Sequence, residues 1–318
     1  MDHLTYKKPR ICILGCGNIG ALHAKNLQWR ATLYFCSRSR VSAYKFNLKF
    51  KGEGIFDDLN AVLESDVDAV VIASPPEHHK DQIIALLEAG KSVLVEKPMC
   101  ISPEEIVEIE TALERVETPL LMIAENYYYK PSLSYIKHMV TQGDIGEMRS
   151  VSVKKLTTQQ AQGWKNAYGA LLEGGIHFIA LISDLFDAVP EQIEAIFPGY
   201  SGSTPERESV VRMVYPTGAI GELHYSWQTP SLTKGVFQHS YIEGTRGRIV
   251  FESNGIYIRK PQKGFRILWP GLKDLMGYRA MIADFLSCLQ NRSRQPYSNF
   301  ARANRDLKIV FDAYACDG

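Results

Sequence analysis

The stretch ICILGCGNIGALHAKNL, residues Ile11 to Leu27, holds the pattern that decides the fold. It passes from an uninterrupted apolar run to Gly15, Gly17 and Gly20, and then to apolar residues at helical spacing. G-x-G-x-x-G spacing alone is weak evidence, because glycine is common in turns. Here the first glycine closes an expected strand and the third lies in an expected helix, which is the context of a dinucleotide cradle. We predict such a cradle rather than a plain turn; the loop of a methyltransferase is the competing interpretation.

Each glycine has a separate expected role in this cradle. Gly15 permits a tight turn, Gly17 lets the backbone approach a pyrophosphate, and Gly20 lets the helix pack closely on the strand. The phosphates would lie at the helix N-terminus, where unpaired N–H groups and the helix dipole favour an anion.

The end of the next apolar run, TLYFC, indicates which dinucleotide is bound. A site for NAD commonly places an acidic residue there, roughly 20 residues beyond the glycines, to bind the ribose hydroxyls. This chain has Ser37, Arg38, Ser39 and Arg40 instead. Arginine pairs with phosphate in a fork and serine adds donors, so we expect NADP(H) to be favoured, with NAD(H) possible. The alternative interpretation is a solvated basic loop in an NAD site of loose specificity.

Short apolar runs alternate with amphipathic segments from Ile11 to Ala124, which predicts an α/β fold with a doubly wound parallel sheet. After Lys130, β-rich runs such as AIGELHYSW and RIVFE indicate an α+β domain on an open, mostly antiparallel sheet. Helices over about 131–142, 175–187, 275–291 and 299–316 would cover it. We place the dinucleotide-binding domain at residues 1–125 and the substrate-binding domain at 126–318.

Composition excludes several classes of function. The 318 residues carry a formal net charge of +1 and no run of five like charges, which gives no support for a nucleic-acid or membrane-surface role. We find neither a signal peptide nor a membrane span, and expect a cytoplasmic protein. The six cysteines are scattered without a C-x-x-C pair, so we expect reduced thiols and no metal site.

Four motifs together make the chain resemble the Gfo/Idh/MocA oxidoreductases. They are GCGNIG at residues 15–20, SPPEHH at 74–79, VLVEKP at 93–98 and GALLEGGIHF at 169–178. The resemblance runs over essentially the whole chain. It implies a Rossmann domain, an open sheet often used for homo-oligomerisation as a dimer or tetramer, and hydride transfer between a nicotinamide and a sugar, polyol or related alcohol. The cofactor contacts that it implies, besides the cradle glycines and the ribose loop, are Asn18, Ile19, Ser74, Pro75, His79, Glu96 and Lys97.

The resemblance also implies catalytic residues. Lys97 matches the lysine that lies beside the nicotinamide and contacts the reacting oxygen, and a strand's carboxyl end faces the ligand in such folds. His177 matches the family's histidine, and a place early in a helix would favour the neutral imidazole that a general base requires. Glu173 stands four residues earlier, where we expect it either to orient His177 or to bind substrate.

Two departures make the substrate unsafe to carry over. Glu173 replaces the family's usual aspartate, and Ala180 stands where many members have a second one. Further substrate contacts are expected from the domain junction ENYYYKP and from the loop before Glu173, namely Tyr127, Tyr128, Lys130, Trp164 and Lys165.

The leading hypothesis is an NADP(H)-preferring dehydrogenase or reductase that acts on a secondary alcohol or ketone of a carbohydrate-like molecule. Two rivals remain open at this point. One is a catalytically inactive nucleotide-binding regulator on the same fold, and the other is a reductase of a non-sugar substrate.

Overall fold

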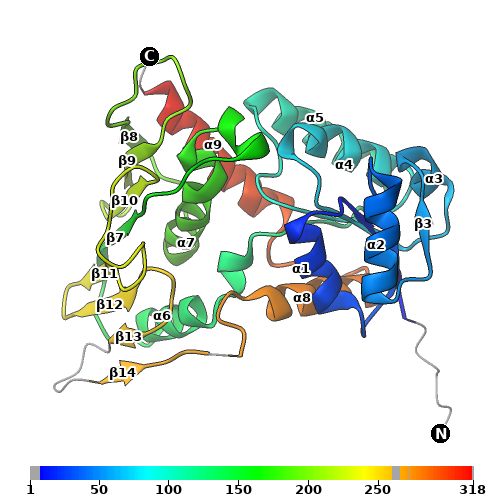
Figure 1. Cartoon of the computed structure of the whole chain (residues 1–318). Helices are drawn as coiled ribbons and strands as arrows, with labels where there is room; N and C mark the ends of the chain where they lie inside the picture. The colour runs from blue at the N-terminus through cyan, green and yellow to red at the C-terminus, as the bar shows by residue number, and fades with distance from the viewer. Residues whose placement is uncertain (1–7, 260–265, 272, 317–318) are drawn as a thin grey trace, which may run out of the picture. The chain divides into compact units, whose positions relative to one another are not determined.

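The computed structural model describes residues 8–259, 266–271 and 273–316. The chain divides into two compact units (Figure 1). The first comprises residues 1–124 and 281–300, and the second comprises residues 125–280 and 301–318. The chain therefore returns to the first unit late, with most of helix α8.

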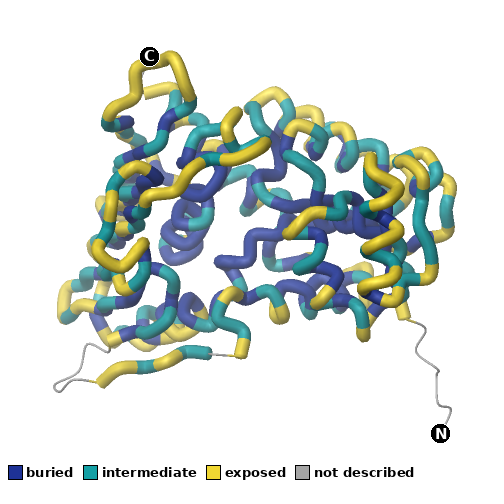
Figure 2. Tube along the Cα trace, in the orientation of Figure 1, coloured by how far each residue is buried: buried dark blue, intermediate teal, exposed yellow. Residues whose placement is uncertain are grey.

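The first unit contains a parallel sheet in the order β3-β2-β1-β4-β5-β6. Its strands are β1 (Arg10–Leu14), β2 (Thr32–Cys36), β3 (Gly54–Phe56), β4 (Ala69–Ile72), β5 (Ser92–Val95) and β6 (Leu121–Ile123). Strands β1, β4, β5 and β6 are almost wholly buried, as Figure 2 shows, because helices cover both faces of a doubly wound sheet. The order of the strands reverses between β1 and β4, which is where such folds bind ligands, outside the carboxyl ends of the strands.

The helices of this unit are α1 (Asn18–Leu27), α2 (Arg40–Phe50), α3 (Leu59–Glu64), α4 (His79–Glu88), α5 (Pro103–Arg115) and α8 (Tyr278–Gln290), with a 3-10 turn, η1 (Pro76–His78). In Figure 1, α4 and α5 lie above the sheet and α1 and α8 below it. Side chains at the start of α5 cap the helix. The Ser102 hydroxyl accepts the N–H of Glu105 at 3.3 Å, and the Glu105 carboxylate accepts the N–H of Ile101 at 2.8 Å.

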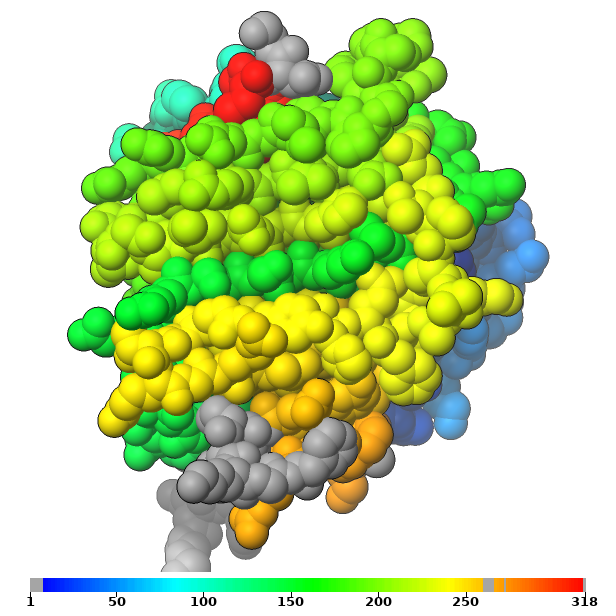
Figure 3. Space-filling view, turned by 90° about the vertical axis from the view of Figure 1, so that its left-hand side faces the viewer, coloured from blue at the N-terminus to red at the C-terminus, as the bar shows by residue number. Residues whose placement is uncertain are grey.

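The second unit contains a sheet in the order β14-β13-β12-β11-β7-β10-β9-β8. Its strands are β7 (Met148–Leu156), β8 (Gln192–Ile196), β9 (Glu208–Val214), β10 (Ile220–Ser226), β11 (His239–Gly244), β12 (Arg248–Glu252), β13 (Ile258–Arg259) and β14 (Ile267–Leu268). The predicted mostly antiparallel sheet is confirmed, and within it β7 and β10 pair in parallel. Figure 3 looks onto one broad face, where β8 to β12 lie side by side.

Helices α6 (Pro131–Thr141), α7 (Ile176–Phe186) and α9 (Phe300–Ala315) lie on the other side of this sheet (Figure 1). The remaining turns are η2 (Asn126–Tyr129), η3 (Gly163–Ala167) and η4 (Leu171–Gly175), the last a π-helical turn that runs directly into α7. A side chain at Gly221 of β10 would come within 2.7 Å of Ile182, so α7 packs tightly on the sheet. This packing fixes η4 and the start of α7, which carry the expected catalytic residues.

Candidate functional site

The glycine turn after β1 has the geometry that its sequence predicts. Gly15 has a φ of +116°, and a β-carbon there would lie 2.4 Å from the carbonyl oxygen of Ala73. A β-carbon at Gly20 would lie 2.0 Å from the carbonyl oxygen of Gly15, so only glycine lets α1 pack this closely on the turn. Gly17, in contrast, faces open space.

These features fit a dinucleotide pyrophosphate. Helix α1 begins at Asn18, no side chain caps it, and its first turn holds no acidic residue. Its first backbone N–H groups therefore remain available to an anion at the positive end of the helix dipole. The open space beside Gly17 allows a ligand to approach the backbone closely.

The loop after β2 joins the same edge of the sheet. The Ser39 hydroxyl caps α2 by accepting the N–H of Ser42 at 3.3 Å, and Arg38 is exposed. Arg40, the first residue of α2, pairs with Asp57, which follows β3. Asp57 could not be placed from the sequence, because β3 is too short to be predicted. Of the two arginines in the loop, Arg38 is thus the one without an acidic partner among the described residues.

His79 ties together the loops that follow β4 and β5. Its ring nitrogens lie 2.9 Å from the carbonyl oxygen of Ser74 and 2.8 Å from that of Pro98. Glu96, at the end of β5, lies 2.7 Å from Nε2 of the buried His23 on α1. His79 therefore links the loops after β4 and β5, and Glu96 links β5 to α1, next to the expected cofactor site. Between them, Lys97 is partly exposed at the carboxyl edge of the sheet.

The second unit holds His177 in a defined orientation. Its Nδ1 lies 2.7 and 2.9 Å from the two carboxylate oxygens of Glu125, a residue that is 4% exposed. A carboxylate only accepts hydrogen bonds, so Nδ1 carries the hydrogen and Nε2 presents a lone pair. Nε2 has no hydrogen-bonding partner among the described residues. This arrangement suits a group that accepts a proton from a ligand.

Tyr127 forms the floor under this imidazole. The two rings stack with centroids 4.7 Å apart, and the Tyr127 N–H donates to Glu125 at 3.0 Å. The Lys130 ammonium lies 4.0 Å from the centre of the Tyr127 ring. That ammonium is buried without a hydrogen-bonding partner, and burial lowers the pKa of Lys130 to about 8. Tyr127 thus packs directly against His177, Lys130 contacts the Tyr127 ring, and both residues are buried.

Glu173, in the π-helical turn η4, pairs with Lys165 at 2.5 Å. Lys165 belongs to the loop between β7 and η4, and its ammonium lies 5.6 Å from the centre of the Trp164 ring. Because Glu125 already orients His177, substrate binding is the role that we carry forward for Glu173. Trp164, Lys165 and Glu173 lie together, and Ala180 is fully buried in α7.

Tyr128 points to a different part of the second unit. Its hydroxyl donates to Asp306 on α9, and Arg305 donates to that hydroxyl at 3.3 Å. The ring is 7% exposed. The structure therefore brings Tyr127 but not Tyr128 to the imidazole of His177.

Glu125 is the residue that sequence reasoning missed. It opens the ENYYYKP stretch that we expected to contact substrate, but it is separated from His177 by 52 positions. The only signal in the sequence is an acidic residue at the start of that stretch. An acidic residue on the surface would look the same, so the sequence does not distinguish the two.

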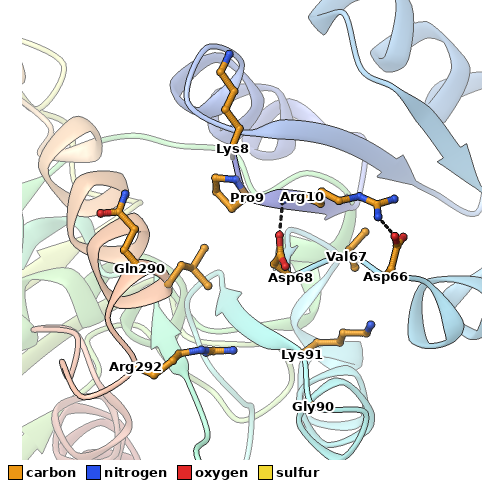
Figure 4. A pocket seen from close by; sticks show the side chains of 11 residues that line it. Lys8, Pro9, Arg10, Asp66, Val67, Asp68, Gly90, Lys91, Gln290 and Arg292 are labelled. Carbon is orange, nitrogen blue, oxygen red and sulfur yellow. Dashed lines mark hydrogen bonds and ion pairs between the residues drawn. The ribbon is translucent and has the colours of Figure 1, made fainter. Parts of the chain in front are cut away.

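A cleft of about 710 Å³ in the first unit lies at the opposite edge of the parallel sheet (Figure 4). It includes Arg10 at the start of β1, whose guanidinium pairs with Asp66 and whose N–H donates to Asp68 at 2.7 Å. Lys91 donates to the carbonyl of Ser65 at the C-terminal end of α3. Arg10 and Lys91 are thus already paired with nearby acidic residues and with the end of a helix. We therefore keep the carboxyl edge of the sheet as the candidate site.

Over the described part of the chain, no cluster of histidine, cysteine, aspartate or glutamate is arranged to hold a metal ion. Within the same residues no helix is long and apolar enough to cross a membrane.

Two family models match the chain. Residues 9–123 match an oxidoreductase family with an NAD-binding Rossmann fold, and residues 133–250 match the GFO/IDH/MocA C-terminal domain. Both matches fall on separate sequence ranges in the order of the two predicted domains.

Among curated proteins, the chain is 29% identical over 216 residues to trans-1,2-dihydrobenzene-1,2-diol dehydrogenase of Mus musculus, covering 66% of this chain and 62% of that enzyme. It is 26% identical over 205 residues to inositol 2-dehydrogenase of Rhodococcus erythropolis, covering 62% and 58%. The chain thus spans less than two thirds of the length of these relatives.

Solved structures share the fold at lower identity. An oxidoreductase from Agrobacterium radiobacter, in complex with NAD⁺, L-tartaric acid and magnesium, has a TM-score of 0.86 at 17% identity, covering 98% of this chain and 96% of that one. A 3-ketoreductase from Actinomadura kijaniata, in complex with TDP-benzene and NADP, has a TM-score of 0.82 at 20% identity, covering 97% and 98%.

Proposed function

Since this chain belongs to the Gfo/Idh/MocA oxidoreductase family, we propose that it transfers a hydride between a nicotinamide dinucleotide and a secondary alcohol or ketone of a sugar, polyol or related small molecule. The observation that carries the proposal is His177, whose Nδ1 is held by Glu125 and whose Nε2 is left as a base. A protein that only binds nucleotides has no use for this arrangement. The curated relatives, a diol dehydrogenase and an inositol dehydrogenase, support the substrate class.

The residues divide the work of such a reaction. The glycine turn and the start of α1 would hold the pyrophosphate, with Asn18, Ile19, Ser74 and Pro75 beside it. When bound, the nicotinamide supplies or accepts the hydride. Lys97 donates a hydrogen bond to the reacting oxygen and polarises it, and His177 takes up or returns the hydroxyl proton at Nε2. Glu125 keeps His177 in the required tautomer and stabilises the imidazolium that forms.

Trp164, Lys165 and Glu173 would bind the substrate. An ammonium and a carboxylate 2.5 Å apart offer donors and acceptors to neighbouring hydroxyl groups, and an indole beside them gives a flat apolar surface. Because Ala180 removes one carboxylate, we expect fewer hydroxyl groups to be held than in a typical polyol dehydrogenase. A non-sugar ketone therefore remains within the proposed range.

We also propose a preference for NADP(H). Arg38 is exposed and has no acidic partner among the described residues, so its guanidinium is available to a 2′-phosphate together with Ser37 and Ser39. Arg40 contributes less, because Asp57 already neutralises it.

Two further proposals concern the whole protein. The chain forms a homodimer or homotetramer through the broad face of the second sheet (Figure 3). It works in the cytoplasm, which the six free cysteines support.

The first experiment is a fluorescence titration of the purified protein with NADPH and NADH, followed by a panel of sugars, polyols and ketones. We expect NADPH to bind more tightly, and Arg38→Ala to weaken NADPH binding about tenfold while leaving NADH binding unchanged, as loss of one charged hydrogen-bond pair predicts. Equal effects on both nucleotides would contradict the role of Arg38.

Turnover decides between the enzyme and the regulator. Lys97→Ala and His177→Asn should each abolish most turnover while nucleotide affinity changes little. Tight nucleotide binding without turnover of any compound would favour the regulator. Failure to bind either nucleotide would overturn the interpretation of the glycine turn.

A further inference from the structure

The loop that carries Trp164 and Lys165 has almost no packing of its own. Residues 157–169 connect β7 to the helical segment of Glu173 and His177, and none of them is buried. The single turn η3 inside the loop likewise contributes no buried side chain. Hydrophobic burial therefore cannot fix the position of Lys165, and hydrogen bonds must do so.

Two adjacent residues before β9 supply these bonds. Arg207 donates to the carbonyl oxygens of Tyr168 at 2.9 Å and Asn166 at 3.4 Å, so one guanidinium holds the loop at two points. The same guanidinium lies 5.7 Å from the centre of the Trp227 ring, which anchors it to the end of β10.

Glu206 holds the end of the loop. Its carboxylate accepts the N–H of Ala170 at 2.9 Å, the N–H of Leu171 at 2.8 Å and the hydroxyl of Tyr314 at 2.7 Å. Ala170 and Leu171 open the helical segment that contains Glu173 and His177, so Glu206 caps this segment from outside. Burial raises the pKa of Glu206 above its usual value, although these donors oppose the shift.

Gly169 shows how closely the loop approaches this carboxylate. A β-carbon there would lie 2.2 Å from Oε1 of Glu206 and 2.5 Å from the Tyr314 hydroxyl. The backbone of Gly169 does not have a positive φ, so its lack of a side chain is explained by this contact alone. The carbonyl of Gly169 in turn accepts the N–H of Glu173 at 3.1 Å.

We propose that Glu206 and Arg207 are positioning residues that clamp the loop 163–170 and so set the Lys165–Glu173 pair for substrate binding. The inference rests on the proposed function, because it takes Lys165 and Glu173 as substrate contacts. The contacts of both clamp residues lie in the loop, in the helical segment of Glu173 and His177, on Tyr314 and on Trp227, so the clamp should act on substrate affinity and leave cofactor affinity alone.

Amide hydrogen exchange tests the clamp without any substrate. In Glu206→Gln we expect the amide of Leu171 to exchange about tenfold faster, as loss of a charged acceptor predicts. The amide of Ala170 should change less, because it also donates to the backbone carbonyl of Glu206 at 3.0 Å. In Arg207→Met the faster exchange should fall on residues 163–168. Arg246→Met is the matched control, since Arg246 also donates to a backbone carbonyl, that of Gly143, at 2.7 Å, but in a different turn. Exchange that is unchanged in the loop, or equally raised by the control, would overturn the clamp.

Kinetics test its consequence. Arg207→Met should raise KM for the substrate about tenfold while kcat changes less than about threefold, and Arg207→Lys should restore part of the affinity because it keeps the charge but loses the fork. Gly169→Ala, which alters neither clamp residue, should raise KM in the same way. An unchanged KM in all three variants, with normal turnover, would overturn the inference; absence of turnover in the unmodified protein would instead overturn the proposed function.

Discussion

The role of base that we propose for His177 rests on three neighbouring side chains. Glu125 fixes which nitrogen carries the hydrogen, Tyr127 stacks on the ring, and the Lys130 ammonium contacts the Tyr127 ring. Glu125 and Lys130 are both buried, and the negative charge of Glu125 opposes the effect of burial on the pKa of Lys130. At the scale of single residues, the proposed base therefore depends on Glu125, to which we assign no contact with substrate or cofactor.

Glu125→Gln tests this dependence. The amide keeps the shape of the side chain but can no longer stabilise an imidazolium, so we expect kcat to fall about a hundredfold, within the range that positioned acid–base groups contribute. Steady-state kinetics would measure the loss, and fluorescence titration should show unchanged NADPH binding. Glu191→Gln, at an exposed position of the same unit, is the control. A kcat within twofold of the unmodified protein would remove Glu125 from the mechanism.

At the scale of elements, helix α9 holds η2 in place, and η2 carries Tyr127, which stacks on His177. Asp306 accepts the Tyr128 hydroxyl and pairs with Arg305 at 3.1 Å. Burial is the largest influence on this carboxyl and raises its pKa to about 7, although Arg305 and Tyr128 oppose the shift; the charge of Glu125 adds to it. The attachment of α9 to η2 should therefore depend on pH.

The direction of this dependence follows from the two states. A carboxyl whose pKa is raised on folding contributes stability below its unfolded value of 3.8, and this contribution is lost as the pH rises through about 7. Asp306→Asn cannot titrate, so its melting temperature, relative to the unmodified protein, should rise by a few degrees between pH 5 and pH 8. Thermal unfolding across this range measures the difference. Asp312→Asn, exposed on the same helix, should give a flat difference, and a flat difference for Asp306→Asn would contradict the argument.

At the scale of the whole molecule, the second sheet has one face packed on α7 and one broad face without a helix among the described residues (Figure 3). Because Gly221 faces α7, Glu222 and His224 on the same strand face the other way. Glu222 pairs with Ser152, and Ser152 pairs with Tyr241, so Tyr241 also lies on the broad face. A broad face that mixes apolar and polar side chains is suited to association with a second copy.

Sedimentation velocity would test the proposed homo-oligomer. Val210 pairs with His224 across β9 and β10 and so lies on this broad face. Val210→Lys should shift the protein to monomer, because the symmetry of a homodimer repeats the buried charge. Val189→Lys, the same substitution at an exposed position outside the strands, should leave the mass unchanged. A monomeric unmodified protein would contradict the proposal directly.

Elements with local signals can be predicted from the amino-acid sequence. Buried strands read as short apolar runs, the glycine spacing specified the turn after β1, and Ser102 with Glu105 specified the start of α5, because each depends on residues within a few positions. Strands β3, β8 and β14 were not predicted. β3 and β14 have only three and two residues, and β8 is an exposed edge strand, so all three carry little hydrophobic periodicity.

Contacts between residues far apart in the sequence became known from the folded chain. It paired His177 with Glu125, Arg40 with Asp57 and Ala170 with Glu206, and it returned residues 281–300 to the first unit. No local pattern encodes these contacts, because a polar side chain in the sequence looks the same whether its partner is water or a buried residue far along the chain. Burial removes the water, and the need to satisfy each buried polar group then selects the partner.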